Sequence, residues 1–230
     1  MEFQRARNEE QKSIRREQII EATLKLYERE PLEKITLASI ANELNFSRAN
    51  LYKYVSTKEE IFLWILSSDL EKWVKKTYDK LKDYDQLELK TFCLLWSEQM
   101  YENQRFLKLF SILASVLRSN VTTKSLEILK QDLANSFGKL NLITKKFIPN
   151  LTEDELKLFN EYQIYYASSL YSPAVSSKNQ RQEFQTVSLL EAPPDFVSRF
   201  AGYLEVIIFL LNYFSIKIYL DYNLSIFAYV

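Results

Sequence analysis

TLASIANELNFSRANLYKYVSTK, residues 36–58, has the spacing of two short helices joined by a turn. In its first half, apolar residues recur at the i, i+3, i+4 and i+7 positions, which form one face of a helix. These residues are Leu37, Ile40, Ala41 and Leu44. The Thr36 hydroxyl is placed to cap this helix, and Asn45 tolerates the left-handed backbone that ends one. The pattern predicts a short helix between Thr36 and Asn45.

The second half of this stretch predicts another short helix, capped by Ser47 and packed against the first. Its apolar side consists of Leu51, Tyr54 and Val55. Two helices joined by about three residues form a helix-turn-helix, whose second helix enters the DNA major groove. No acidic residue occurs from Ser47 to Lys58, which suits a helix that faces phosphates. A helical hairpin of an ordinary α-protein shows the same apolar spacing, and this alternative stays open here.

A longer helix is predicted directly after the hairpin. Thr57 and Glu60 have the spacing of a capping box, and Lys58 lies at the helix N-terminus, where backbone N–H groups attract phosphate. The apolar pattern continues far enough to predict a helix over residues 58–82. This helix is too long for a compact DNA-binding bundle, so we expect it to connect two domains.

Residues 19–62 resemble the N-terminal DNA-binding domain of TetR-family transcriptional regulators. The shared residues are Ala22, Tyr27, Thr36, Ile40, Ala41, Leu51, Tyr52 and Lys58. Pro31 and Asn45 stand where the family usually has Gly, and Val55 stands where Phe is common. These departures leave the groove-facing positions unchanged.

The resemblance and the helical pattern together predict binding to a double-stranded DNA operator. The residues expected at this interface are Thr36, Ser47, Arg48, Ala49, Asn50, Tyr52, Lys53, Tyr54 and Lys58. Arg48 is the best candidate to read a base, because Arg bonds bidentately to guanine O6 and N7. Asn50 and Lys53 are expected to reach a base edge or a phosphate. The resemblance implies phosphate contacts, which position the protein without specifying sequence, for Thr36, Tyr52, Tyr54 and Lys58.

The composition favours an all-α protein. The 230 residues include only two glycines and five prolines, and the formal net charge is zero, so a DNA-binding surface requires segregation of charge. The chain has no histidine and one cysteine, Cys93, which we expect to fill the core. We therefore predict no enzyme activity, no cofactor and no metal site, although a carboxylate-pair enzyme remains an alternative. The N-terminus lacks the apolar core of a secretory signal, which predicts a cytoplasmic protein.

The predicted architecture has two domains. A three-helix helix-turn-helix domain covers residues 1–57, with a loose arm over residues 1–10 and a first helix that ends before Pro31. A helical ligand-binding and dimerisation domain covers residues 58–230, and its first helix is the connecting helix. The further helices are expected at about 86–102, 104–118, 122–147, 153–171 and 195–219, with a mobile linker over 172–194. The longest uncharged span of the last helix, residues 206–216, is shorter than the roughly 20 residues of a membrane helix.

Dimerisation is implied by the resemblance and supported by the size of the reading element. One helix-turn-helix grips few base pairs, so two copies on the half-sites of a palindromic operator are expected. The two C-terminal helices can form a four-helix bundle across a two-fold axis. The predicted interface residues are Tyr162, Tyr166, Phe200, Leu204, Ile207 and Leu211. Packing of these residues inside one subunit is the alternative.

A ligand pocket in the second domain is also implied by the resemblance. The candidate lining residues are Trp73, Phe92, Trp96, Gln99, Met100, Phe110, Phe137 and Tyr165. Such an aromatic, uncharged pocket suits a small apolar or aromatic ligand, although aromatic residues at helical spacing are usually plain core. The sequence thus predicts a homodimeric repressor that a ligand releases from DNA. The alternative is an architectural or partner-binding DNA-binding protein without an inducer.

Overall fold

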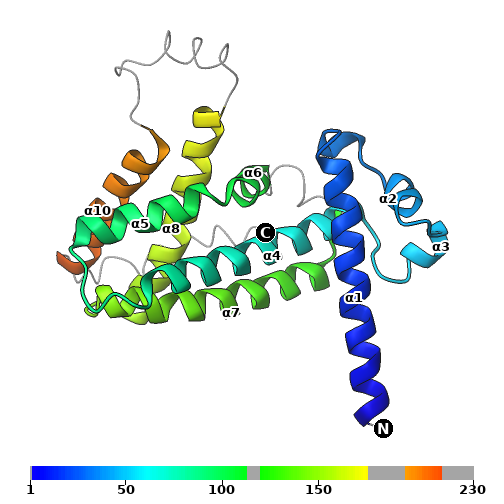
Figure 1. Cartoon of the computed structure of the whole chain (residues 1–230), viewed down its shortest axis with the longest axis horizontal. Helices are drawn as coiled ribbons and strands as arrows, with labels where there is room; N and C mark the ends of the chain where they lie inside the picture. Colours follow the sequence, from blue (N-terminus) through cyan, green and yellow to red (C-terminus); the bar gives the residue numbers. More distant parts are fainter. Residues whose placement is uncertain (1, 113–119, 176–194, 214–230) are drawn as a thin grey trace. The chain divides into compact units, whose positions relative to one another are not determined.

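The computed structural model describes residues 2–112, 120–175 and 195–213, which form helices and their connections with no strand in these ranges (Figure 1). The helices are α1 (Glu2–Tyr27), a 3-10 helix (Leu32–Lys34), α2 (Leu37–Glu43), α3 (Arg48–Leu51), α4 (Lys58–Leu81), α5 (Leu89–Tyr101), α6 (Gln104–Ile112), α7 (Thr123–Phe147), α8 (Glu153–Val175) and α10 (Phe196–Tyr213). The predicted all-α class is confirmed. Within the described ranges, no helix combines the length and the apolar character needed to cross a membrane.

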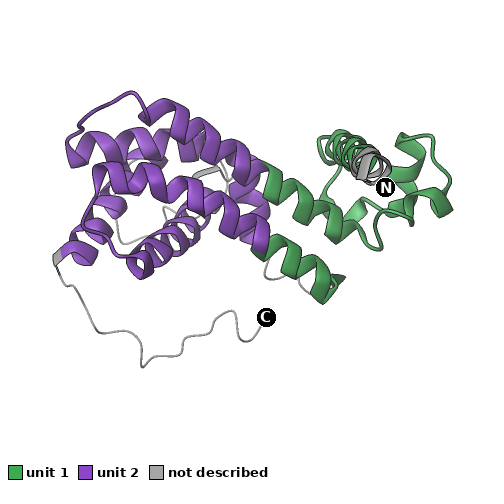
Figure 2. Cartoon of the chain, turned by 90° about the horizontal axis from the view of Figure 1, so that it is seen from below, with its two compact units in different colours: residues 1–68, 115–130 green, residues 69–114, 131–230 purple. Residues whose placement is uncertain are grey.

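The described residues form two compact units (Figure 2). Unit 1 contains residues 2–68 and 120–130, and unit 2 contains residues 69–112, 131–175 and 195–213. The division falls inside α4 instead of at the predicted residue 57, because the first turns of α4 complete the core of unit 1. Unit 1 also includes the start of α7, which the sequence placed in the second domain.

The core of unit 1 joins the apolar faces of α1, α2 and α3 to the first turns of α4. Ile19, Ile40 and Leu51 have no exposed surface, and the rings of Tyr27 and Phe62 meet edge to face with centroids 5.4 Å apart. Removal of this apolar surface from water is the main driving force for packing such short helices, which are marginal in isolation.

Helix α1 differs from the prediction at both ends. It begins at Glu2, so residues 2–10 are helical and not a loose arm, because neither Gly nor Pro interrupts the chain before Tyr27. In Figure 1 its N-terminal half extends beyond α2 and α3 of the same unit. The helix ends at Tyr27, and Pro31 instead precedes the 3-10 helix with an extended backbone.

Unit 2 is a helical bundle in which α10 packs against α5 and α8, and α6 packs against α8. Helix α8 continues to Val175, so residues 172–175 are helical and not part of a linker. The rest of the predicted linker, residues 176–194, lies outside the described residues, as do residues 113–118 and 214–219 of two predicted helices. The capping box predicted for α8 is present, since Glu155 N–H donates to Thr152 Oγ1 and Thr152 N–H to Glu155 Oε2.

Candidate nucleic-acid interface

The helix-turn-helix begins at a capping box on α2. Thr36 Oγ1 accepts a hydrogen bond of 3.1 Å from Ser39 N–H, and Ser39 Oγ accepts one of 3.0 Å from Thr36 N–H. These bonds satisfy backbone donors that a helix N-terminus leaves without partners. The predicted cap at Thr36 is therefore confirmed, with Ser39 as its reciprocal partner.

The turn between α2 and α3 depends on Asn45. Its φ of 54° makes it the one non-glycine residue with positive φ in the described chain, as its position predicted. The reversal lets Phe46 N–H donate to Ala41 O at 2.8 Å, which closes the end of α2. The Arg15 guanidinium of α1 lies over the Phe46 ring, 5.2 Å from its centroid.

Helix α3 is held by one cap and one buried anchor. Ser47 Oγ accepts a hydrogen bond of 3.2 Å from Asn50 N–H, which confirms the predicted cap. Leu51 is fully buried and Val55 nearly so. The helix spans only Arg48–Leu51, and the chain from residue 52 to 54 forms turns, so the predicted helix was too long.

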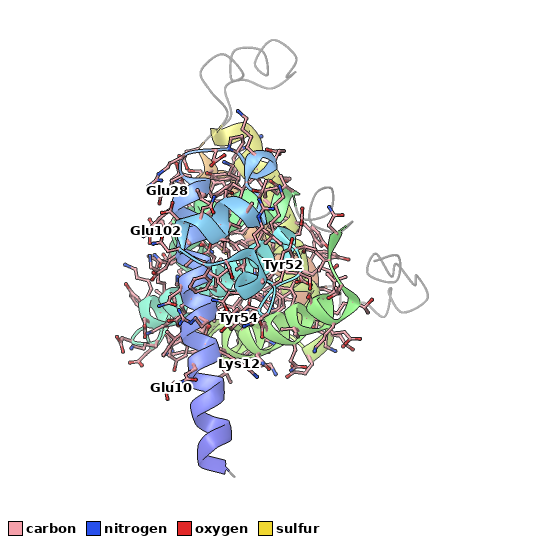
Figure 3. All side chains as sticks on the ribbon, turned by 90° about the vertical axis from the view of Figure 1, so that its right-hand side faces the viewer. Glu10, Lys12, Glu28, Tyr52, Tyr54 and Glu102 are labelled. Carbon is pink, nitrogen blue, oxygen red and sulfur yellow. The ribbon has the colours of Figure 1, made fainter. Side chains whose placement is uncertain are left out.

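The side chains predicted to meet DNA lie on and beside this short helix. Arg48, Ala49 and Lys53 are exposed, and Asn50 is half-buried. Tyr52 is 57% exposed, while Tyr54 is half-buried; both are labelled in Figure 3. A cationic, hydroxyl-bearing surface of this kind can donate to phosphates and to base edges.

Lys58 has a structural partner that the sequence did not reveal. Its ammonium donates to Leu32 O at 2.8 Å and to Glu33 O at 3.3 Å, so it fastens the 3-10 helix to the start of α4. An ammonium has three N–H donors, which leaves one that can face a phosphate. No sequence motif marks this contact, because it joins positions about 25 residues apart through backbone carbonyls.

Glu60 caps α4 in a slightly different way from the prediction. Glu60 N–H donates to Thr57 Oγ1 at 3.3 Å as expected, but its carboxylate accepts from Ser56 N–H at 2.9 Å, one residue earlier than in a capping box. Burial opposes ionisation of this carboxyl. The hydrogen bonds from Ser56, Ser125, Thr122 and Thr57 outweigh burial and hold the pKa of Glu60 below its ordinary value.

The residues predicted to line a ligand pocket fall into separate groups in unit 2. Trp96 contacts Trp73 and Phe92, with ring centroids 5.8 and 5.2 Å apart, and all three side chains are buried. Met100, one turn beyond Trp96, is also buried. Phe110 instead contacts Tyr165, with centroids 5.5 Å apart. Gln99 and Phe137 are half-buried, on α5 and α7 respectively.

A chain of neutral polar groups runs through this aromatic region. Trp96 Nε1 donates to Gln163 at 2.6 Å, Gln163 donates to Asn160 at 3.2 Å, and Asn160 donates to Asn141 at 2.7 Å. Trp73 Nε1 and Thr77 Oγ1 are buried and have no hydrogen-bond partner among the described protein atoms. Such groups are rare in native interiors because they lose their hydration without replacement.

A groove of about 230 Å³ lies elsewhere in unit 2, between α4 and α7. It is lined by Glu71, Val74, Lys75, Tyr78, Ser136, Lys139 and Leu142. None of the predicted pocket residues lines it. The described residues contain no cluster of three potential metal ligands. Cys93 is buried as expected, and burial, with a smaller effect of Glu205, raises the pKa of its thiol to about 12.

Three of the predicted dimer residues are buried within the single chain. Phe200, Leu204 and Ile207 are at most 8% exposed because they face α5 and α8 of their own subunit. Tyr166 and Leu211 are half-buried, and Tyr162 is 45% exposed. Apolar periodicity identified the apolar faces of α8 and α10 but could not distinguish a subunit core from an interface.

Known proteins resemble the chain in both sequence and fold. Residues 19–65 match the family of bacterial regulatory proteins named tetR, and residues 67–209 match the tetracyclin repressor-like C-terminal domain. The uncharacterized HTH-type transcriptional regulator YfiR of Bacillus subtilis (strain 168) is 33% identical over 67 residues, which are 29% of this chain and 33% of YfiR. The match thus spans about one third of the length of that curated relative.

The fold is similar to that of a solved structure, the fatty acid degradation regulator FadR from Bacillus halodurans. The TM-score is 0.51 with 10% sequence identity, and the similarity covers 84% of this chain and 94% of that one. At this identity the similarity concerns the fold alone. The C-terminal family match alone covers more than half of the chain, and it continues the N-terminal match almost without a gap. The chain therefore belongs to the TetR family of DNA-binding transcriptional regulators, which are not enzymes.

Proposed function

We propose that the protein is a repressor that binds a palindromic operator as a homodimer and leaves it when a small ligand binds unit 2. The observation that carries the DNA-binding part is the exposed, acid-free surface from Ser47 to Lys58 on a rigidly capped helix-turn-helix. The tetracyclin repressor-like match of residues 67–209 supports repression and ligand response. The protein would act in the cytoplasm, where its operator is.

The DNA contacts divide into reading and positioning roles. Arg48 reads a base edge, most naturally guanine, and Asn50 and Lys53 reach a base or a phosphate. The rest of the DNA-binding surface, at the wall of the groove, consists of Ser47, Ala49, Tyr52 and Tyr54. Thr36, at the cap of α2, and Lys58, through its remaining N–H, contact phosphates at the edges of the site.

The dimer would form through the outward faces of α8 and α10. Tyr162 on α8 and Val206, Phe209 and Leu210 on α10 are 44% to 58% exposed. The α10 residues share one helix face with Gly202, where an added Cβ would meet nothing within 4 Å. A glycine at this position lets another helix approach closely.

A second copy of the chain is the occupant that this apolar face fits. The half-buried Tyr166 and Tyr203 rings stack with centroids 3.8 Å apart, so α8 and α10 lie side by side at this level. Burial and the neighbouring Tyr166 and Tyr162 raise the pKa of Tyr203 to about 12. A two-fold axis through it would build a four-helix bundle and present two recognition helices.

The ligand is expected to be uncharged where it is buried. Among the buried polar side chains described in unit 2, only Asp69 carries a charge, and Arg105 pairs with it. A ligand carboxylate in this region would lack a counter-charge, and burial of an unpaired charge is strongly unfavourable. Trp73 Nε1 and Thr77 Oγ1 are available to hydrogen-bond a ligand oxygen beside the aromatic rings. A neutral aromatic or apolar molecule with one acceptor fits these groups.

The close packing of the aromatic residues favours a second candidate function. The Trp96 ring packs directly against the rings of Trp73 and Phe92. A protein that binds no inducer would have such a filled core. Such a protein would bind DNA as an architectural or partner-binding factor. The two candidates differ only in whether a small molecule changes DNA affinity.

One experiment tests both parts of the proposal. The purified protein would select fragments from a random DNA pool, with and without small molecules extracted from cells. We expect a palindromic consensus in the absence of extract and loss of retained DNA in its presence. A Trp73→Phe variant should bind the same consensus but respond less to the extract. Selection without a consensus would disprove the operator, and an unchanged consensus with every extract would favour the second candidate.

A further inference from the structure

Glu60 joins three separate segments of unit 1. It lies in the first turn of α4 and is only 6% exposed. Its Oε2 atom accepts from Ser56 N–H in the loop that follows α3, at 2.9 Å. Its Oε1 atom accepts from the hydroxyls of Ser125, at 2.7 Å, and Thr122, at 3.1 Å. We call this set of contacts the Glu60 clasp.

The partners on the far side of the clasp form the start of α7. Thr122 Oγ1 also accepts from Ser125 N–H at 3.2 Å, so Thr122 caps α7 while it donates to Glu60. The Ser125 hydroxyl lies 2.7 Å from the Glu60 carboxylate and 2.9 Å from the Thr122 hydroxyl, while the Ser125 N–H is the group that Thr122 caps. These residues are more than 60 positions from Glu60 in sequence, yet residues 120–130 belong to the same compact unit.

We propose that the first turn of α7 positions the recognition helix, with Ser125 and Thr122 acting through Glu60 on the loop after α3. The inference rests on the proposed role of α3 in DNA binding and adds residues that do not touch DNA. Ser125, Thr122 and Glu60 are positioning residues for operator recognition.

The shortness of α3 makes such support necessary. A helix of four residues has little stability of its own, so its direction depends on what fixes its two ends. Before α3, the left-handed Asn45 and the Ser47 cap fix the chain. After it, Ser56 is the next backbone donor held by a side chain, and that side chain is Glu60. Hydrogen bonds to an ionised carboxylate are about twice as strong as neutral ones.

Helix α7 also connects unit 2 covalently to the segment that forms the clasp with Glu60. Helix α7 is continuous from Thr123 to Phe147, and its residues from 131 onward belong to unit 2. Helix α4 is a second continuous route, from Lys58 to Leu81. A change in unit 2 that shifts α7 along its axis would therefore reach Glu60 and Ser56 without passing along α4.

The sharpest test is Ser125→Ala in the full chain, with operator affinity measured by fluorescence anisotropy. The substitution keeps the Ser125 N–H that Thr122 caps, and alanine is a good helix former, so α7 should stay folded. We expect operator binding to weaken by about three- to tenfold, because a smaller fraction of molecules holds α3 in the binding orientation. The salt dependence of binding should not change, since no phosphate contact is lost.

The matched control is Ser136→Ala, the same substitution at a buried serine of the same helix in unit 2. It should leave operator affinity at the wild-type value. Ser125→Thr keeps the hydroxyl and should restore binding, which a purely steric role would not explain. Wild-type affinity in Ser125→Ala, or an equal loss in Ser136→Ala, would overturn the proposal.

Hydrogen exchange at the Ser56 amide gives a readout that needs no DNA. Its protection should fall in Ser125→Ala and in Glu60→Gln, because the acceptor Oε2 becomes less well placed or is replaced. It should be unchanged in Ser136→Ala. If the wild-type protein selected no operator, the proposed function would fail, while this exchange measurement would still confirm or reject the clasp. Unchanged Ser56 protection in both clasp variants would reject it.

Discussion

At the residue scale, Arg48 and Lys53 are both exposed on or beside α3 but should contribute differently to DNA binding. A guanidinium can form two parallel hydrogen bonds with one guanine, whereas an ammonium acts as a point charge. The affinity of the protein for one DNA sequence and the salt dependence of that affinity can therefore be measured separately. The first identifies a side chain that reads a base, and the second identifies one that contacts a phosphate.

Arg48→Ala should weaken binding to the selected operator by about 1–3 kcal/mol and relax specificity at one base position. Lys53→Ala, if Lys53 meets a phosphate, should weaken binding to all sequences evenly and reduce the salt slope by about one. Anisotropy titrations at several salt concentrations, with operator and scrambled DNA, measure both quantities. Equal losses on both DNAs in Arg48→Ala would contradict its reading role.

Glu60 should make the stability of unit 1 depend on pH. Its folded-state pKa is lowered, so below the ordinary glutamate pKa of about 4.3 the unfolded chain binds a proton that the folded chain does not. Its contribution to the free energy of unfolding is therefore fully present above that pKa. It is lost as pH falls through the lower, folded-state pKa.

Urea unfolding of the wild type and Glu60→Gln at a series of pH values between about 3 and 7 would measure this contribution. The wild type should lose more of its urea midpoint in the acid range than Glu60→Gln does. Glu28→Gln, at an exposed glutamate directly after α1, is the control and should behave as the wild type does. Parallel acid losses in the wild type and Glu60→Gln would show that the clasp carboxylate has no such role.

At the scale of elements, the sequence predicted the local features of the helices correctly but not the contacts between distant residues. The caps at Thr36, Ser47 and Thr152 and the left-handed Asn45 each depend on neighbouring residues, so the sequence shows them directly. The contacts of Lys58 with Leu32 O and of Ser125 with Glu60 join residues 26 and 65 positions apart, and no local pattern encodes them. Two of these distant contacts lie beside the helix-turn-helix, at the start of α4.

The candidate interface shows the same limit. Apolar spacing in α10 correctly indicated a helix with buried residues, but Phe200, Leu204 and Ile207 face their own subunit. The residues left outward, Val206 and Phe209, could not be separated from them without knowing that α5 covers the other face. The identity of a hydrophobic residue does not show which surface it packs against, because the hydrophobic effect is non-directional.

Helix α4 is tied to α6 by a buried ion pair within unit 2. Arg105 donates to both carboxylate oxygens of Asp69 at 2.7 and 2.5 Å, and the Asp69 side chain is 4% exposed. Arg105→Ala should lower the free energy of unfolding by roughly 1–3 kcal/mol, because it leaves Asp69 buried without a counter-charge. The partial exposure of Arg105, 38%, keeps this value below that of a fully buried pair.

Urea unfolding monitored by circular dichroism would measure this loss. Lys82→Ala removes the exposed partner of Asp79 and should cause no measurable change. Adding Asp69→Asn to Arg105→Ala should recover part of the lost stability, since the unpaired charge is removed. If the double variant were less stable than Arg105→Ala by the full cost of a second independent lesion, the two side chains would not act as a pair.

At the scale of the whole molecule, operator binding should depend on the association of two chains. Each chain presents one recognition helix of four residues, which can read only a few base pairs. When two copies are joined, the second half-site binds as an intramolecular event, which raises the overall affinity by about 10²–10⁴. Loss of the dimer should therefore remove specific binding even though every DNA-contacting residue is intact.

Phe209→Glu tests this dependence, because it places a charge in the middle of the exposed face of α10, where Phe209 is 58% exposed. We expect the variant to run as a monomer in size-exclusion chromatography with light scattering and to bind the operator at least 100-fold more weakly. Leu142→Glu is the matched control, since Leu142 is 68% exposed on α7 and lines the groove with α4. It should remain a dimer with wild-type affinity. A monomeric wild type, or a Phe209→Glu variant that stays dimeric, would show that α8 and α10 do not form the contact. A monomeric variant that kept full operator affinity would show instead that one recognition helix is sufficient for binding.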